Sequence, residues 1–330
     1  MNKKEEEKLK AKARKISIAE GSAHGVMEGF GYNYITPFAL ALGAGSAHIG
    51  FLSSIPSLLG SLSRLYSSRL IEKFSRKKIL IASVMLQTLM WIPLIFLGVA
   101  YFFFGLDSAI ASILLIGIYT LLIILGAFGT PAWNSWMRDL TEKRTDSYFG
   151  KRNTIVGSVA LVSMFIAAFI LDGFGRKTFF GFGIIFFIAL LGRSISIFLF
   201  KKQYEPKIRL HKGYYFSFKD FVKHMSYNNF GKFVLFSGVI SFAVAIASPF
   251  FSVYMLNHLD FNYKTYMFVI LSSAVVSLVS MPFWGKLGDK YGEVKLIRIC
   301  GFLIFLVPLL WFLSAFLFTG YSLGLVAIYY

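Results

Sequence analysis

The segment Trp284-Gly285-Lys286-Leu287-Gly288-Asp289-Lys290-Tyr291-Gly292-Glu293-Val294-Lys295 is a short, charged stretch with several glycines between two long apolar runs. A second version lies 217 positions earlier, at Ser67–Lys78. The two versions carry similar side chains at these equivalent positions: Lys286 and Arg69, Leu287 and Leu70, Asp289 and Glu72, Lys290 and Lys73, Tyr291 and Phe74, Lys295 and Lys78. A charged turn that occurs twice between apolar runs predicts two copies of one multi-helix unit in a membrane protein.

The composition agrees with a membrane protein. Of the 330 residues, 56% are hydrophobic and only 15% are charged, and the mean hydropathy is +0.66. Soluble domains contain about 25% charged residues. Several apolar runs reach the roughly 20 residues that a helix needs to cross a bilayer. The one cysteine, Cys300, has no partner for an intrachain disulfide and is expected to pack in an apolar environment.

We expect an all-α polytopic fold with nine transmembrane helices and the start of a tenth. The expected helices cover residues 17–42, 47–70, 78–104, 108–133, 152–171, 179–200, 229–256, 264–284 and 295–318. A polar loop is expected at 134–151. The predicted parts are a cytoplasmic basic tail (1–16), an N-terminal six-helix bundle (17–200), a cytoplasmic linker (201–228) and a partial C-terminal bundle (229–330). Because the chain stops at Tyr330 inside the tenth run, we expect a fragment that lacks helices 11 and 12.

The positive charges set the expected orientation. The chain has a formal net charge of +18, and 28 of its 34 Lys and Arg residues fall in five segments. These segments are the tail to residue 15, 69–78, 138–152, 201–223 and 286–298. Positive residues in short loops mark the cytoplasmic side of a membrane. The N-terminus is therefore expected in the cytoplasm, and binding of nucleic acid is not needed to explain the charge.

A second landmark supports the repeat. Thr36-Pro37-Phe38 in the first expected helix matches Ser248-Pro249-Phe250 in the seventh. An even number of helices separates the copies, so the repeats are expected to be parallel, which is a transporter arrangement. Pro37 and Pro249 are expected to kink their helices.

These features resemble the major facilitator superfamily. Gly285, Asp289, Lys290, Gly292 and Lys295 fit its signature loop, and the earlier copy, with Arg69, Glu72 and Lys73, fits it less well because Ser68 and Ser75 replace glycines. The run Pro131–Leu140, followed by Tyr148–Asn153, is similar to the connection between helices 4 and 5 in prokaryotic members.

The resemblance implies two six-helix halves that give alternating access to a central site. It also implies that the loops act as latches that stabilise one access state, with Asp289 facing the region of Arg152 in the other half. Asp289 as a solvated turn residue is the alternative interpretation.

The first expected helix carries the candidate site. Glu20, His24 and Glu28 recur every four residues, so they form one ridge. Ionisable groups inside a membrane are costly and usually face a cavity or a partner. Glu28 lies closest to the midplane and is the first candidate for proton coupling, with His24 second and Glu20 expected near the surface. A static polar contact between helices is the alternative. The adjacent ridge has the small-residue spacing that allows close packing of helices: Gly21, Gly25 and Gly29.

Arg193 is a strong cation inside the sixth expected helix. Three roles are open for it: binding an anionic group of a substrate, neutralising an acid, or reaching the inner surface with its long side chain. Weaker candidates for the same cavity are Asn33, Tyr34, Gln87, Trp91 and Asn134.

The sequence contains no phosphate-binding loop, no cluster with metal-site spacing and no nucleophile motif. We therefore expect no enzyme, no metal and no cofactor. The favoured interpretation is a secondary active transporter in the plasma membrane. It would act as a monomer, move a small molecule and use protons. The alternatives are an uncoupled facilitator, a drug or metabolite exporter, and a non-transporting receptor on the same fold.

Overall fold

The computed structural model describes residues 3–67, 74–141, 145–174, 178–206, 223, 227 and 229–317. The chain divides into two compact units, 1–213 and 214–330. All regular structure in the described residues is helical. This agrees with the expected all-α class.

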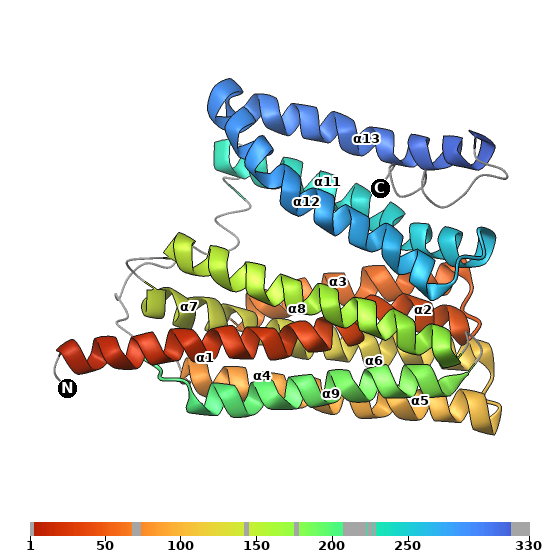
Figure 1. Cartoon of the computed structure of the whole chain (residues 1–330), viewed down its shortest axis with the longest axis horizontal. Coiled ribbons are helices and arrows are strands. Elements are labelled where there is room, and N and C mark those ends of the chain that lie inside the picture. Colours follow the sequence, from red (N-terminus) through yellow and green to blue (C-terminus); the bar gives the residue numbers. More distant parts are fainter. Residues whose placement is uncertain are drawn as a thin grey trace. The chain divides into compact units, whose positions relative to one another are not determined.

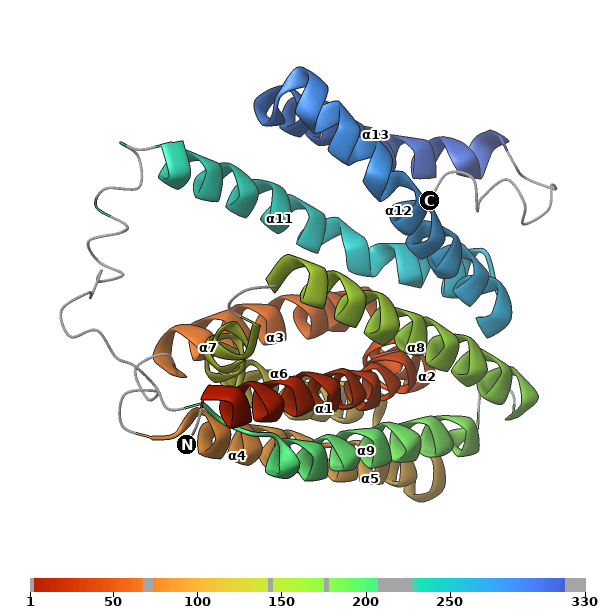
Figure 2. The same ribbon diagram turned by 60° about the vertical axis from the view of Figure 1, so that its left-hand side comes forward.

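The first unit is a bundle built around its first helix. Its elements are α1 (Lys3–Phe30), the 3-10 turn η1 (Tyr32–Tyr34), α2 (Ile35–Ala41), α3 (Ser46–Ser67), α4 (Arg76–Leu89), α5 (Trp91–Phe104), α6 (Ser108–Phe128), α7 (Thr130–Thr141), α8 (Thr145–Phe174) and α9 (Phe179–Lys202). Helix α1 packs against both α8 and α9, while α3 packs against α6 and α4 contacts α6, α7 and α9 (Figures 1 and 2). Helices α8 and α9 thus flank α1, which carries the candidate ridge.

Three of the expected helices are broken, each shortly before a proline. The first breaks at Gly31–Tyr34 before Pro37, the next at Met90 before Pro93, and the third at Gly129 before Pro131. Proline has no backbone N–H and cannot donate to the carbonyl four residues earlier, so it starts a helix better than it continues one. The expectation of a bend at Pro37 is correct, although the break precedes the proline itself.

The glycine ridge of α1 explains how closely α8 approaches. A side chain at Gly25 would place its Cβ 2.8 Å from the backbone oxygen of Val156, and one at Gly29 would meet the backbone oxygen of Ala160. Only glycine fits where two helix backbones come this close. The predicted close-packing role of this ridge is confirmed.

The second unit contains α11 (Asn229–Val253), the π-helical turn η3 (Tyr254–His258), α12 (Tyr263–Tyr291) and α13 (Glu293–Leu317). The turn expected over Trp284–Lys295 is wrong in extent: α12 runs to Tyr291, and a single residue separates it from α13. That residue is Gly292, with φ of +82°, a left-handed conformation that glycine adopts without strain.

Two other expected boundaries are also wrong. Residues 3–16, expected as a solvated and partly helical tail, are helical throughout and continue α1; Ala13 is fully buried and the Arg14 Nη1 donates to the Leu140 carbonyl at 2.8 Å. The polar loop expected at 134–151 is mostly helical, because α7 extends to Thr141 and α8 begins at Thr145. The helical spacing of Trp136 and Leu140 gives α7 an apolar face that packs in the core.

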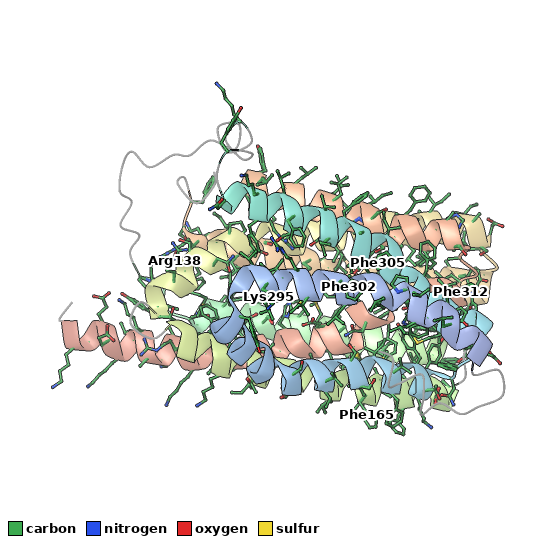
Figure 3. The ribbon with its side chains drawn as sticks, turned by 90° about the horizontal axis from the view of Figure 1, so that it is seen from above. Arg138, Phe165, Lys295, Phe302, Phe305 and Phe312 are labelled. Carbon is green, nitrogen blue, oxygen red and sulfur yellow. The ribbon has the colours of Figure 1, made fainter. Side chains whose placement is uncertain are left out.

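Six helical stretches in the described part of the chain are long and apolar enough to cross a membrane. They are Arg76–Phe104, Ser108–Thr141, Tyr148–Phe174, Phe179–Lys202, Gly231–Asn257 and Val294–Leu313. Large apolar side chains cover their outer faces, as Phe302, Phe305 and Phe312 do along α13 at 62–73% exposure (Figure 3). Helix α1, with its acids and histidine, and α3, with its many serines, are too polar to be included. The count of nine or ten crossings stays a prediction.

Candidate functional site

A cavity of about 210 Å³ lies inside the first unit, at the broken end of α6 and beside α1. Six helices and the α6–α7 break contribute charged, aromatic and small residues to it: Glu20, His24, Leu80, Gly126, Gly129, Thr130, Trp133, Arg152, Val156, Arg193 and Phe200. Three of the predicted candidates, Glu20, His24 and Arg193, therefore share one cavity.

Glu20 is buried between two arginines. Its side chain is 3% exposed, with Oε2 at 3.4 Å from Arg152 Nη2 and Oε1 at 3.6 Å from Arg193 Nη1. Glu20 is therefore not a solvated residue, and its expected depth near the membrane surface stays a prediction. The helix begins at Lys3, so Glu20 falls in its middle, where α8 and α9 cover it.

Arg193 connects Glu20 to a chain of hydrogen-bonded polar side chains. Its Nε donates to Gln87 Oε1 at 2.7 Å, and Gln87 Nε2 donates to the Tyr32 hydroxyl at 2.6 Å. Arg193 is only 5% exposed, so its guanidinium does not extend to the surface. Of the three open roles, the geometry fits the neutralisation of an acid and leaves the binding of an anion possible.

Arg152 is the residue of this site that the sequence placed elsewhere. It was expected to face Asp289 as part of a latch, but within its own bundle it contacts Glu20 and lies 4.7 Å above the Trp133 ring. Its Nε also donates to the Ser17 carbonyl at 3.3 Å. The basic segment 138–152 gave no indication of which of its residues turns inward.

His24 and Glu28 continue the ridge away from the two arginines. His24 Nδ1 lies 3.9 Å from Glu28 Oε2, and their side chains are 35% and 47% exposed. Glu28 is more open to its surroundings than Glu20 and contacts no arginine in the described residues. The ridge thus holds one clamped carboxylate and one accessible carboxylate, two turns apart.

Apart from Gln87, the remaining predicted candidates either hold parts of the bundle together or lie outside the cavity. Tyr34 is fully buried and donates to the Met164 carbonyl at 2.6 Å, so it joins α8 rather than lining the cavity. Trp91 is also fully buried and packs on Tyr32. Asn33 donates to the Glu28 carbonyl at 3.1 Å and closes the end of α1. Asn134 lies exposed on α7, outside the cavity.

A third buried arginine, which sequence reasoning did not single out, joins three helix ends. Arg76 is 1% exposed, with Nη1 at 2.6 Å from Asp139 Oδ2 and Nε at 3.6 Å from Glu205 Oε1. It also donates to the carbonyls of Ser135 at 2.9 Å and Pro206 at 2.8 Å. This cluster fixes the start of α4 to α7 and to the chain after α9.

The latch residues are mostly beyond what the structure describes. Arg69, Glu72 and Lys73 lie outside the described residues, and for Gly285, Asp289 and Lys290 the structure describes only the helical backbone of α12. Lys295 is described, with its Nζ 4.9 Å from the centre of the Tyr291 ring. The contact between Asp289 and the region of Arg152 stays a prediction.

A family model described as Major Facilitator Superfamily matches residues 18–330. The chain belongs to this superfamily. The resemblance inferred from the signature loop is thereby confirmed. The superfamily is one of membrane transporters rather than enzymes, and the chain is a multi-pass membrane protein.

Two relatives give a narrower comparison. The chain is 23% identical over 262 residues to "Multidrug resistance protein 2" of Bacillus subtilis (strain 168), across 76% of this chain and 60% of that protein. It is 25% identical over 289 residues to "Multi-drug resistance efflux pump PmrA homolog" of Lactococcus lactis subsp. lactis (strain IL1403), across 84% of this chain and 66% of that protein. The chain therefore spans about three fifths to two thirds of the length of these relatives.

Proposed function

We propose that this protein is a proton-coupled secondary transporter that exports small organic molecules by alternating access between two six-helix halves. The observation that carries the proposal is the ionisable ridge of α1, whose Glu20 and His24 line a cavity inside the bundle. Placing such groups within a membrane is costly, and they usually mark the path of a proton or a substrate. The names of the two relatives favour export over import.

Glu28 is the proposed proton carrier. Its carboxylate is nearly half exposed and has the His24 imidazole as its neighbour at 3.9 Å. Glu20, by contrast, is held by two cations. A carrier must reach solution to bind and release a proton, so the accessible carboxylate suits this task better than the clamped one.

The proposal also covers the orientation of the transporter, the membrane in which it lies and its oligomeric state. We place the basic N-terminal end of α1 in the cytoplasm and the protein in the plasma membrane as a monomer. The positive residues of the connections on that side carry this assignment. An accessible cysteine placed at Glu7, on the exposed part of α1, should react with an impermeant thiol reagent only from the cytoplasmic side.

The test of function is transport by the full-length protein in proteoliposomes. A panel of small fluorescent organic compounds is followed with and without a pH gradient across the membrane. We expect the gradient to drive movement of at least one compound, and Glu28→Gln to abolish this dependence while the compound still binds. Glu7→Gln, which neutralises an exposed acid on the same helix, is the matched control. Unchanged pH dependence in Glu28→Gln would remove Glu28 as the carrier, and no gradient-driven movement of any compound would reject proton-coupled export.

A further inference from the structure

The cavity carries more positive than negative charge. Two guanidiniums, those of Arg152 and Arg193, face the single carboxylate of Glu20, and all three side chains are at most 11% exposed. Arginine stays protonated in proteins. Glu28, beyond His24 on the ridge, does not line the cavity. With Glu20 ionised, the lining is left with one excess positive charge, or more if His24 is protonated.

The contacts that hold Glu20 are long. Charge-assisted hydrogen bonds between a guanidinium and a carboxylate are usually about 2.7–2.9 Å long. Here the distances are 3.4 Å to Arg152 and 3.6 Å to Arg193. The Arg76 to Asp139 contact in the same unit, at 2.6 Å, shows how close such a pair can be. Both cavity guanidiniums therefore have N–H groups that can serve another acceptor.

From this excess charge and loose pairing, we infer that the cavity binds the acidic group of a small organic anion, such as a carboxylate or a sulfonate. The group would lie between Arg152 and Arg193 and compete there with the Glu20 carboxylate. The planar guanidinium recognises such groups through two parallel hydrogen bonds. Val156 and Phe200 line the same cavity and supply apolar contact for the rest of the molecule.

The volume also limits the ligand. Sites for drug-sized molecules usually measure about 300–1,000 Å³. A cavity of about 210 Å³ suits one ring that carries one acidic group. The inference rests on the proposed function, because it names the class of molecule that the transporter carries.

Three probes of the same ring separate charge from shape: benzoate, benzamide and benzamidinium. Their binding to the purified full-length protein in detergent is measured by isothermal titration calorimetry. We expect benzoate to bind at least about tenfold more tightly than the other two, since hydrogen bonds to charged groups are the strong ones. Absence of benzoate binding, or tighter binding of benzamidinium, would overturn the assignment.

Variants identify the position of the acidic group. Arg193→Gln should weaken benzoate binding at least about tenfold. The affinity of Arg193→Lys should lie between those of Arg193→Gln and the wild type, because lysine keeps the positive charge but lacks the two parallel N–H donors of the guanidinium. Glu20→Gln should tighten binding, because it removes the competing carboxylate. A structural role for Glu20 predicts the opposite sign, so weaker binding to Glu20→Gln would reject the competition. Arg138→Gln, which changes an exposed arginine of α7 (Figure 3), is the matched control and should bind as the wild type does.

The two proposals fail in different ways. If benzoate binds as described but no compound moves in proteoliposomes under a pH gradient, the anion site stands and the proposed function fails. If neutral or cationic compounds move under the gradient while benzoate does not bind, the transporter stands and the anion site is wrong.

Discussion

Two buried arginines of the first unit, Arg76 and Arg193, use the same chemistry in different ways. Arg76 faces two carboxylates and two backbone carbonyls, and three of its contacts lie between 2.6 and 2.9 Å. Arg193 shares one carboxylate with a second arginine at 3.4–3.6 Å and has one close contact, to Gln87. The first cluster has an excess of negative charge and the second an excess of positive charge.

The difference separates a contact that holds helices from one that can exchange partners. Arg76 has acceptors on several sides. Arg193 and Arg152 border open space, where water or a ligand can replace Glu20. Variants of the two clusters should therefore differ in the free energy of unfolding, although the arginines of the two clusters are buried to a similar extent.

The largest effect is expected at Arg76. Arg76→Gln removes the cation and leaves Asp139 and Glu205 without it, which for a buried pair costs roughly 3–5 kcal/mol of the free energy of unfolding. An SDS titration of the full-length protein in mixed micelles measures this. Lys78→Gln, on an exposed position of the same helix, is the control and should leave the curve in place. A loss as small as that of the control would mean that the cluster does not hold these helices.

The next effect is expected at Gln87. Gln87→Leu keeps the approximate size of the side chain and removes the 2.7 Å contact to Arg193. A hydrogen bond to a charged group contributes about 1.5–3 kcal/mol, so the same titration should show a loss in that range. A loss equal to that of Arg76→Gln would erase the distinction between the clusters.

A smaller effect is expected at Glu20. Glu20→Gln should lower stability by about 1–2 kcal/mol, because its contacts are long and the arginines it leaves border a cavity that water can enter. The SDS titration of the full-length protein measures this change. Should the unfolding curve shift as far as for Arg76→Gln, Glu20 would be a structural residue.

The smallest effect is expected at Trp133. Trp133→Phe keeps an aromatic ring beneath Arg152 but weakens the cation–π interaction between the ring and the guanidinium. Such an interaction contributes about 0.5–1 kcal/mol at a partly open site. Stability should therefore change by less than this amount. A larger loss would show that Trp133 holds α7 and α8 together through its packing on Phe149 as well.

Much of the fold follows from the sequence because a membrane imposes simple rules on helices. Apolar runs and the signature loop were enough to predict the helical class and the superfamily, and both are confirmed. The boundaries at 3–16 and 134–151 were missed for one reason. A charged or polar helix that packs through a narrow apolar face, as α7 does with Trp136 and Leu140, gives the same composition as a loop.

The site was predicted only in part. Helical spacing identified the ridge with Glu20 and His24, because i and i+4 positions share a face whatever the rest of the fold. Spacing cannot show which distant side chain meets that ridge. Arg152 and Arg193 come from helices 132 and 173 positions away from Glu20 in sequence, and their shared contact depends on how the bundle packs. The same limit explains why Arg76 was missed.

The unbroken course of α1 has a mechanical consequence. At 1.5 Å per residue its 28 residues make a rod of about 42 Å, longer than the roughly 30 Å hydrocarbon core of a bilayer. The same rod therefore carries Lys4, Lys8 and Lys12 at its charged end and Glu20 within the bundle. Because no break interrupts α1, its charged end and Glu20 keep a fixed separation along one helix axis.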